Sequence, residues 1–210
     1  MIAHEAEAQA YVAEMSDAIA MERLTHLAQA LRDENERQNL VSRPSLQAIW
    51  SRHFADSAQL LSHVPRETEG AWLDLGTGAG LPGLVIAILQ PKREVVLVES
   101  RKLRVQWLER MCKELDLANC RVEGARLENV ESFPAAVISA RAFAPLVKLL
   151  RLSARFSTDD TCWVLPKGRS AAQEVQELPK RLQSMFHVEH SVTDHEAGVI
   201  IGRGKVREAL

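Results

Sequence analysis

Apolar residues in the first 64 positions recur at helical spacing, and no strand-like run interrupts them. One helix face has apolar residues at i, i+3, i+4 and i+7: Leu24, Leu27, Ala28 and Leu31. The polar stretch 33–39 predicts that this helix leaves the core there. A second helix begins at Pro44 and ends at Val64, before a proline. Its apolar face comprises Leu46, Ile49, Trp50, Phe54, Ala58 and Leu61. The pattern predicts a helical extension over residues 1–64.

From residue 71 onward, short apolar runs alternate with helical segments. The runs that read as buried strands are 71–75, 95–98, 120–122, 136–139 and 162–165. The helices between and after them cover 84–89, 103–115, 145–150 and 173–182, and the runs 186–192 and 198–202 suggest an antiparallel closing pair. Apolar strands that alternate with helices are typical of a parallel sheet covered on both faces. The fold class is therefore α/β and Rossmann-like over residues 65–210, with a mostly parallel seven-stranded sheet and helices on both faces.

Composition and net charge exclude some classes of function. The 210 residues are 46% apolar and 26% charged, which is ordinary for a globular protein. The net charge of −2 excludes a generally basic nucleic-acid binder, so any such binding must use a local patch. Basic clusters at 101–104 and 167–169 follow predicted strands and could rim one crevice. Those at 180–181 and 203–207 are interpreted as solvated surface.

Neither a targeting segment nor a metal site is indicated. No uncharged apolar run reaches 18 residues, and the chain starts with acidic residues rather than a signal peptide. The three cysteines lack C-x-x-C spacing: Cys112, Cys120 and Cys162. We therefore expect a cytoplasmic protein with reduced, buried thiols, no metal and no membrane contact. The four tryptophans lie on apolar faces and are interpreted as core: Trp50, Trp72, Trp107 and Trp163.

The most informative stretch, Asp74 to Gly83, reads D-L-G-T-G-A-G-L-P-G. Its four glycines lie between a strand and a helix, where glycine lets the backbone approach a ligand closely. A plain turn between a strand and a helix rarely needs four glycines. A tight turn without a ligand is therefore the less favoured interpretation.

Two cofactors compete for this stretch. Gly78 to Gly83 matches the dinucleotide fingerprint G-x-G-x-x-G, whereas Asp74 to Gly80 matches the D-x-G-x-G-x-G of S-adenosylmethionine methyltransferases. Glu99 ends the second strand and suits either cofactor, because a carboxylate there can bind ribose hydroxyls. The first strand ends at Leu75, so the dinucleotide register would begin two residues late, and Asp74 would repel a pyrophosphate. Both points favour methyl transfer.

Further motifs indicate a particular protein family and not only a fold class. In chain order they are Asn39-Leu40, Arg52-His53-Phe54-Ala55-Asp56-Ser57, Asp74 to Gly83 with its Leu-Pro-Gly ending, Glu99-Ser100, Ile138 to Phe143 and Lys167-Gly168. Their order and spacing resemble the bacterial glucose-inhibited division protein B family over residues 35–205. The resemblance implies a Rossmann-like S-adenosylmethionine-dependent methyltransferase that modifies N7 of a guanine in 16S ribosomal RNA, guanine 527 in standard rRNA numbering. Two departures are Leu103, where many relatives carry Lys, and the extra Ala140 before Arg141.

The resemblance and the glycine motif together nominate site residues. Cofactor contacts are expected at Gly76, Gly78, Gly80, Leu81, Glu99, Leu127, Glu128 and Arg141. Contacts with the substrate are expected at Arg52, His53, Asp56, Arg141 and Lys167. Arg141 could bind RNA phosphate, guanine O6 or the cofactor carboxylate, or could form only a surface ion pair. A histidine on an apolar helix face is more often simply packed, so the role of His53 depends on the neighbouring motif.

The chemistry implied by the resemblance needs no general base. Guanine N7 has an exposed lone pair and no proton, so positioning and electrostatic stabilisation suffice. We accordingly assign no catalytic residue.

The expected partner is 16S ribosomal RNA or the small ribosomal subunit, bound by a monomer. Three alternatives stay open: a methyltransferase of small molecules, a nicotinamide-dependent dehydrogenase, and a non-catalytic ribosome-binding protein.

Overall fold

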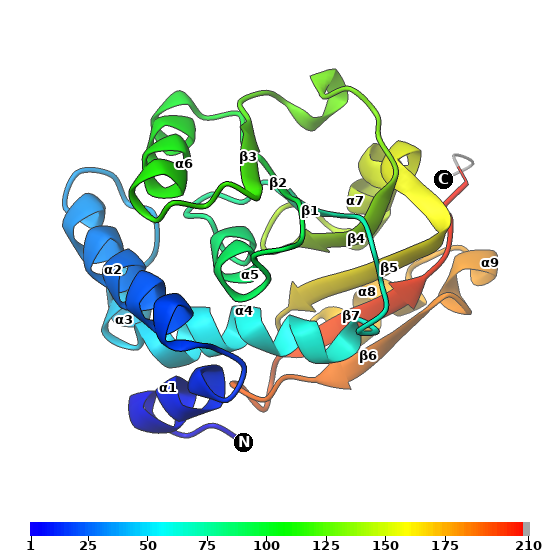
Figure 1. Ribbon diagram of the computed structural model, residues 1–210. Coiled ribbons are helices and arrows are strands. Elements are labelled where there is room, and N and C mark those ends of the chain that lie inside the picture. The colour runs from blue at the N-terminus through cyan, green and yellow to red at the C-terminus, as the bar shows by residue number, and fades with distance from the viewer. Residues whose placement is uncertain (208–210) are drawn as a thin grey trace.

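The computed structural model describes residues 1–207, and its strands form one seven-stranded sheet (Figure 1). The strands are β1 (Ala71–Leu75), β2 (Val95–Val98), β3 (Cys120–Glu123), β4 (Ala135–Ala140), β5 (Ser157–Lys167), β6 (Phe186–His190) and β7 (Gly198–Arg203). Their order is β3-β2-β1-β4-β5-β7-β6. β1 to β5 are parallel, and β7 is antiparallel to both β5 and β6. The predicted sheet and its antiparallel closing pair are confirmed.

Helices cover both faces of this sheet. They are α1 (Glu5–Ala13), α2 (Ala18–Asn35), α3 (Arg43–Gln47), the π-helix η1 (Trp50–Ala55), α4 (Asp56–Ala58), α5 (Gly83–Leu89), α6 (Lys102–Glu114), α7 (Leu146–Ser153), α8 (Ala171–Gln176) and α9 (Lys180–Gln183). Short 3₁₀ turns are η2 (Gln59–His63), η3 (Leu127–Asn129) and η4 (Ala154–Phe156). The helix predicted over 173–182 is instead divided into α8 and α9, because Pro179 has no N–H to continue it.

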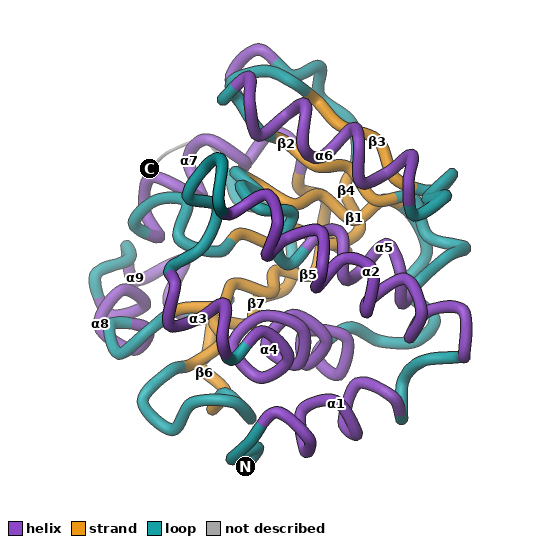
Figure 2. The backbone as a smooth tube through the Cα atoms, turned by 90° about the vertical axis from the view of Figure 1, so that its left-hand side faces the viewer, coloured by secondary structure: helices purple, strands orange, loops and turns teal. Residues whose placement is uncertain are grey.

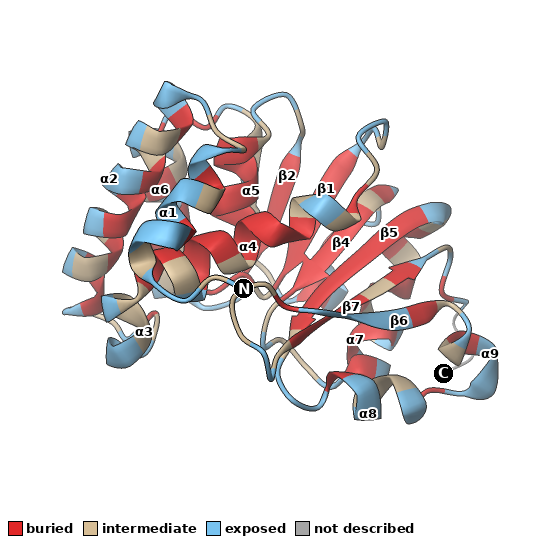
Figure 3. Ribbon diagram, turned by 90° about the horizontal axis from the view of Figure 1, so that it is seen from below, coloured by how far each residue is buried: buried red, intermediate tan, exposed pale blue. Residues whose placement is uncertain are grey.

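Side chains of the central strands alternate between two buried clusters, one on each face. In β1, Trp72 joins the cluster that contains α2, α5 and α6, whereas Leu73 and Leu75 join the cluster with α7 and α8. Figure 3 shows the central strands buried along their length. The N-terminal helices share the first cluster with the strands. The domain division at residues 64 and 65 stays a prediction.

The expectation that the chain leaves the core over 33–39 is wrong at two polar residues. Glu34 and Asn35 are buried at the end of α2. Glu34 Oε2 accepts a hydrogen bond from Arg110 Nη2 at 2.6 Å. Asn35 Oδ1 accepts from the amides of Leu40 and Val41 at 2.9 and 3.0 Å. Both residues are buried because they have partners, which a polarity pattern does not reveal.

The predicted continuous helix from Pro44 to Val64 is also wrong in detail. The chain passes through α3, η1, α4 and η2, and Figure 2 shows the coil labelled α4 nearly end-on, between α1 and the sheet, with α3 beside it. The wider turn of a π-helix accommodates one extra residue. Here it accompanies three consecutive buried residues, His53 to Ala55, next to the exposed Arg52. Such π-turns are frequent at functional sites, and this one carries a predicted substrate motif.

Candidate functional site

The strand ends bring the predicted site residues to one edge of the sheet. Gly76, Glu99 and Arg141 directly follow β1, β2 and β4, and the strand register makes these three ends neighbours. Lys167 ends β5, the next strand along. Strand order reverses between β1 and β4, and open α/β sheets bind ligands at the carboxyl side of such a switch point. The site is therefore expected at this edge.

The loop after β1 has a backbone that glycine adopts readily. Gly76, Gly78 and Gly80 have φ values of 60, 59 and 90°. A Cβ on Gly76 would lie 2.4 Å from Cδ2 of Phe143, so this ring lies directly on the glycine. A Cβ on Gly78 would instead come no closer than 3.4 Å to Arg104 Nη1. The space above Gly78 is a cradle that a larger side chain would fill.

Glu99 connects this loop to the end of β2. Its Oε2 accepts from the Gly78 amide at 3.1 Å and lies 3.8 Å from Arg104 Nη1. Its Oε1 accepts from the amides of Ser100 and Arg101 at 2.7 and 2.8 Å. The side chain is buried, so these contacts hold the carboxylate rigidly beside the loop.

Asp74 lies completely buried beneath the loop. Its Oδ2 accepts from the Gly83 amide at 3.0 Å, and its Oδ1 accepts from Ser139 Oγ at 2.7 Å. The same hydroxyl accepts from Trp72 Nε1 at 2.8 Å. Burial raises the pKa of Asp74 to about 6, although its hydrogen bonds oppose the rise. Asp74 therefore fixes β1, β4 and the start of α5.

The other predicted cofactor residues differ in exposure. Leu81 and Leu127 are buried, in clusters on opposite faces of the sheet. Glu128 is exposed in η3, which follows β3 at the same edge. The structure brings these residues to the predicted edge.

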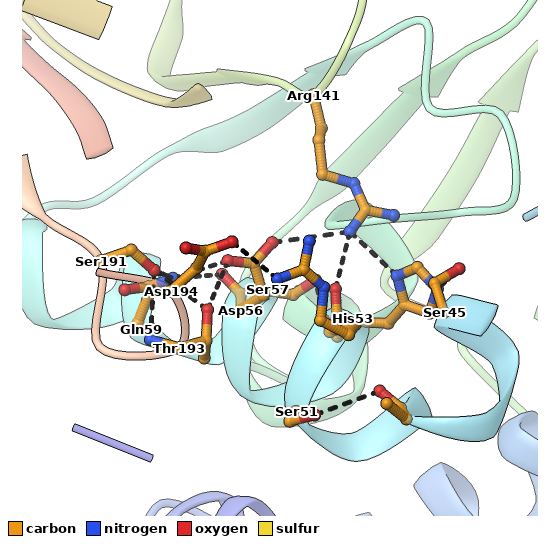
Figure 4. Close-up of polar contacts among 12 residues, drawn as sticks. Ser45, Ser51, His53, Asp56, Ser57, Gln59, Arg141, Ser191, Thr193 and Asp194 are labelled. Carbon is orange, nitrogen blue, oxygen red and sulfur yellow. Dashed lines mark hydrogen bonds and ion pairs between the residues drawn. The ribbon is translucent and has the colours of Figure 1, made fainter. Parts of the chain in front are cut away.

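Arg141 is held by the N-terminal segment (Figure 4). Its Nη1 lies 3.1 Å from His53 Nδ1, 3.4 Å from the backbone oxygen of Arg52 and 3.5 Å from Asp56 Oδ2. The Arg141 side chain is 22% exposed, which argues against an ordinary surface ion pair. The structure thus joins two predicted motifs that are nearly ninety residues apart in sequence.

His53 acts as an acceptor in this arrangement. A guanidinium can only donate, so His53 Nδ1 accepts from Arg141 and Nε2 donates to Ser45 Oγ at 3.1 Å. Burial, followed by the positive charges of Arg141 and Arg52, lowers the pKa of His53 to about 3. The imidazole is therefore neutral near pH 7 and orients Arg141.

Asp56 completes the group. Its Oδ1 accepts from Gln59 Nε2 at 2.8 Å and from Thr193 Oγ1 at 3.0 Å, while its Oδ2 faces Arg141. Burial raises the pKa of Asp56, and Arg141 opposes this rise. The carboxylate is consequently fixed in position by two neutral donors and one cation.

Two further cations lie at the rim, each paired with a carboxylate. Arg52 is half-exposed, and its Nη1 donates to Asp194 Oδ2 at 2.7 Å. Lys167 Nζ donates to Glu174 Oε2 at 2.8 Å and to the backbone oxygen of Ala144 at 3.0 Å. Arg52 or Lys167 can therefore contact a substrate only in one of two ways. Either an N–H group that is not used in the ion pair donates to the substrate, or the cation leaves its carboxylate and binds the substrate instead.

These side chains border a cavity of about 360 Å³ between the N-terminal segment, the ends of β4 and β5, and the segment before β7. Its lining includes Arg52, His53, Asp56, Arg141, Lys167 and Asp194. This volume is in the range of small-ligand sites. Another cavity, of about 410 Å³, lies at the opposite edge near Gly70 and Pro134. Ligands in open α/β sheets bind at the carboxyl ends of the strands, so the first cavity is the candidate site.

Sequence reasoning missed the residues that orient the predicted ones. Ser45, Gln59 and Thr193 hold His53 and Asp56. Gln59 is a polar residue among the apolar positions of a helical segment, and that mismatch could have marked it. Thr193 lies in a loop far along the chain, and no local pattern connects it to Asp56.

Two negative findings apply to residues 1–207. They contain no group of three or more His, Cys, Asp or Glu side chains placed to hold a metal ion. None of their helices is long and apolar enough to cross a membrane.

Comparison with known proteins decides the family. The family model described as rRNA small subunit methyltransferase G matches residues 20–200. The chain belongs to the rRNA small subunit methyltransferase G family. The Ribosomal RNA small subunit methyltransferase G of Erythrobacter litoralis is 64% identical over 207 residues, covering 99% of this chain and 100% of that protein. The protein of the same name from Novosphingobium aromaticivorans is 58% identical over 203 residues, covering 95% of this chain and 88% of the relative.

A solved structure supports the fold of this methyltransferase. A SAM-dependent methyltransferase from Aquifex aeolicus aligns with a TM-score of 0.58 and 15% identity, covering 82% of this chain and 98% of that one. The resemblance stated from the motifs and the Rossmann-like methyltransferase fold are confirmed. Family membership also favours a methyl donor over a nicotinamide cofactor at the glycine loop.

Proposed function

We propose that this methyltransferase transfers a methyl group from S-adenosylmethionine to N7 of a guanine in 16S ribosomal RNA, at guanine 527 in standard rRNA numbering. One observation carries the proposal. The motif Arg52-His53-x-x-Asp56 and Arg141 meet at a cavity at the carboxyl ends of β4 and β5, and the end of β4 is paired with the end of β1, where the glycine loop begins. A substrate base in this cavity would lie beside a donor held over β1.

The residues around the glycine loop fit S-adenosylmethionine. The cradle above Gly78 admits a ligand close to the backbone, and Glu99 lies beside it to accept from the ribose hydroxyls. Leu127 and Glu128 follow β3, where the adenine is bound in this fold according to the family resemblance. Gly76, Gly80 and Leu81 shape the loop. When bound, the cofactor supplies a methyl group activated by its sulfonium.

The chain's own task is to bind and orient the reactants. N7 needs no deprotonation, so the neutral His53 is not required as a base. His53 and Asp56 fix Nη1 of Arg141, whose contacts within residues 1–207 all run through that atom. The remaining guanidinium N–H groups would then be available to donate to guanine O6 or to the cofactor carboxylate. A bidentate contact to O6 and N7 is excluded in the reactive complex, because N7 must remain free.

Ribosomal RNA requires contacts with the phosphate backbone as well. Arg101 and Lys102 are exposed after β2, and Arg169 is exposed after β5. Together with Arg52 and Lys167, they place positive charge along the rim of one edge, although the net charge of the chain is −2. Such a local patch follows an RNA backbone and makes binding salt-dependent.

The test is methyl transfer from labelled S-adenosylmethionine. Small ribosomal subunits, naked 16S RNA and a pool of small metabolites are each incubated with enzyme, and the labelled product is digested to nucleosides. We expect 7-methylguanosine from one position in the RNA. Label only in metabolites, or no label at all, contradicts the proposal.

A pair of arginine variants controls this assay. Arg141→Ala should lower kcat/KM by at least 10-fold while the fold is retained, because the positioning group is lost. Arg66→Ala removes an exposed arginine before β1, away from the cavity, and should retain activity. If both variants were equally active, the reaction would not take place at this cavity, and the proposal would be wrong.

Two further expectations accompany the function. We infer that the enzyme is monomeric, which light scattering in solution tests directly. We also place it in the cytoplasm, because its proposed substrate is assembled there.

A further inference from the structure

One carboxylate in the cavity wall has an acceptor atom without a short hydrogen bond. Asp56 and Asp194 both line the cavity. Each oxygen of Asp194 is engaged, Oδ2 by Arg52 Nη1 at 2.7 Å and Oδ1 by the Glu196 amide at 3.0 Å. Asp56 Oδ1 also accepts two hydrogen bonds, but Oδ2 has only the 3.5 Å ion pair with Arg141. An acceptor with spare capacity therefore faces the cavity.

The proposed reaction fixes how guanine must lie in this cavity. N7 is bonded to C5 and must point toward the methyl donor above β1. C2 is at the opposite corner of the six-membered ring, so its amino group points away from the donor. Asp56 comes from the N-terminal segment and lines the cavity, whereas the glycine loop does not line it. A base whose N7 points to a donor over that loop therefore turns its amino end into the cavity that Asp56 lines.

We infer that Asp56 is the specificity-determining residue for guanine, and that its Oδ2 accepts a hydrogen bond from the exocyclic amino group on C2. This inference rests on the proposed function and deepens it. A carboxylate only accepts hydrogen bonds, and the amino group only donates. Adenine carries a hydrogen atom at C2, so it would leave the carboxylate without its partner.

The surroundings of Asp56 suit this role. The donors on Oδ1, from Gln59 and Thr193, prevent the carboxylate from rotating and keep Oδ2 toward the cavity. Arg141 stabilises the charged form from the side. A base that must reach this wall enters the cavity unpaired, as in other enzymes that act on a single base.

The experiment compares guanosine with inosine, which lacks only the C2 amino group. Small subunits are reconstituted from 16S RNA that carries either nucleoside at the methylated position, and kcat/KM is measured for each. A lost hydrogen bond to a charged group corresponds to about 10- to 100-fold. The wild-type enzyme should therefore methylate inosine about 10- to 100-fold less efficiently than guanosine.

The decisive variant is Asp56→Asn. Gln59 and Thr193 bind the amide oxygen, so the amide NH₂ takes the place of Oδ2 and faces the C2 amino group. Two donors then oppose each other, and the preference for guanosine should disappear or reverse. The matched control is Asp194→Asn, which removes the same charge from the same cavity. Its overall activity can fall, but its ratio of guanosine to inosine should stay that of the wild type.

Each outcome has one meaning. A guanosine preference that disappears in Asp56→Asn and survives in Asp194→Asn supports the inference, since a merely structural role of Asp56 would lower both rates equally. An unchanged preference in Asp56→Asn, or none in the wild type, overturns the inference while guanosine subunits are still methylated. If the wild-type enzyme methylates no guanosine subunit, the proposed function fails first and the inference with it.

Discussion

Replacing Asp74 by Asn should change how the stability of the enzyme depends on pH. The carboxyl is fully buried, and burial raises its pKa from 3.8 to about 6. A raised pKa means that the folded protein holds this proton over a pH range where the unfolded chain has released it. Stability from this group is therefore present below pH 4 and is lost as the pH rises to about 6.

The size of the effect follows from the shift. A change from 3.8 to about 6 corresponds to about 3 kcal/mol in the free energy of unfolding. Asn at position 74 keeps an oxygen for the Gly83 amide and places an NH₂ beside Ser139 Oγ. These rearrangements add a constant offset, whereas the titration is removed.

Urea unfolding at several pH values between 4 and 7.5 measures this effect. The quantity of interest is the free energy of unfolding of the wild type minus that of Asp74→Asn. It should fall by about 2 to 3 kcal/mol across this range, short of the full effect because the unfolded carboxyl is already partly ionised at pH 4, and the m-values should stay equal. The exposed Glu36→Gln is the control, and its difference curve should be flat. A flat curve for Asp74→Asn would show that the reasoning about its burial is wrong.

Three further predictions concern neighbouring groups. Ser139→Ala leaves the Trp72 indole N–H and one Asp74 oxygen unpaired, and should lower the free energy of unfolding by about 2–4 kcal/mol in urea titrations. Gly78→Val puts a branched side chain into the cradle at a φ of 59°, and calorimetry should show at least 10-fold weaker binding of S-adenosylhomocysteine; normal affinity would contradict the motif assignment. His53 has a lowered pKa, so its contribution is present above pH 6.5 and is lost as the pH falls toward 3. Relative to the wild type, His53→Gln should accordingly gain stability on acidification, which is opposite in sign to the Asp74 effect.

The sheet could be predicted because its signals are local. Strands such as Val95–Val98 are short, apolar and β-branched, and the glycine run after Leu75 marks a strand end. Neither signal depends on distant residues. Boundaries were less accurate for β5, which extends over Ser157–Lys167, because its first residues are polar and are partly exposed.

The arrangement of the site was harder to predict, because it depends on contacts between distant segments. Both Arg52-His53-x-x-Asp56 and Arg141 stood out in the sequence, but their meeting at 3.1 to 3.5 Å did not. Buried Glu34 shows the same limit, since its partner Arg110 is 76 residues away. The π-turn at Trp50–Ala55 was missed because a 3.6-residue period describes its apolar positions almost equally well.

The contacts between the N-terminal segment and Arg141 have a consequence for the newly made protein. Translation releases residues 45–59 early, whereas Arg141, Lys167 and Thr193 leave the ribosome much later. The N-terminal segment can therefore line the cavity only after the later residues of its lining have been made. The cavity is complete only after the residues up to Val199 that line it have been synthesised, so a shorter chain has no cavity in which to hold a base.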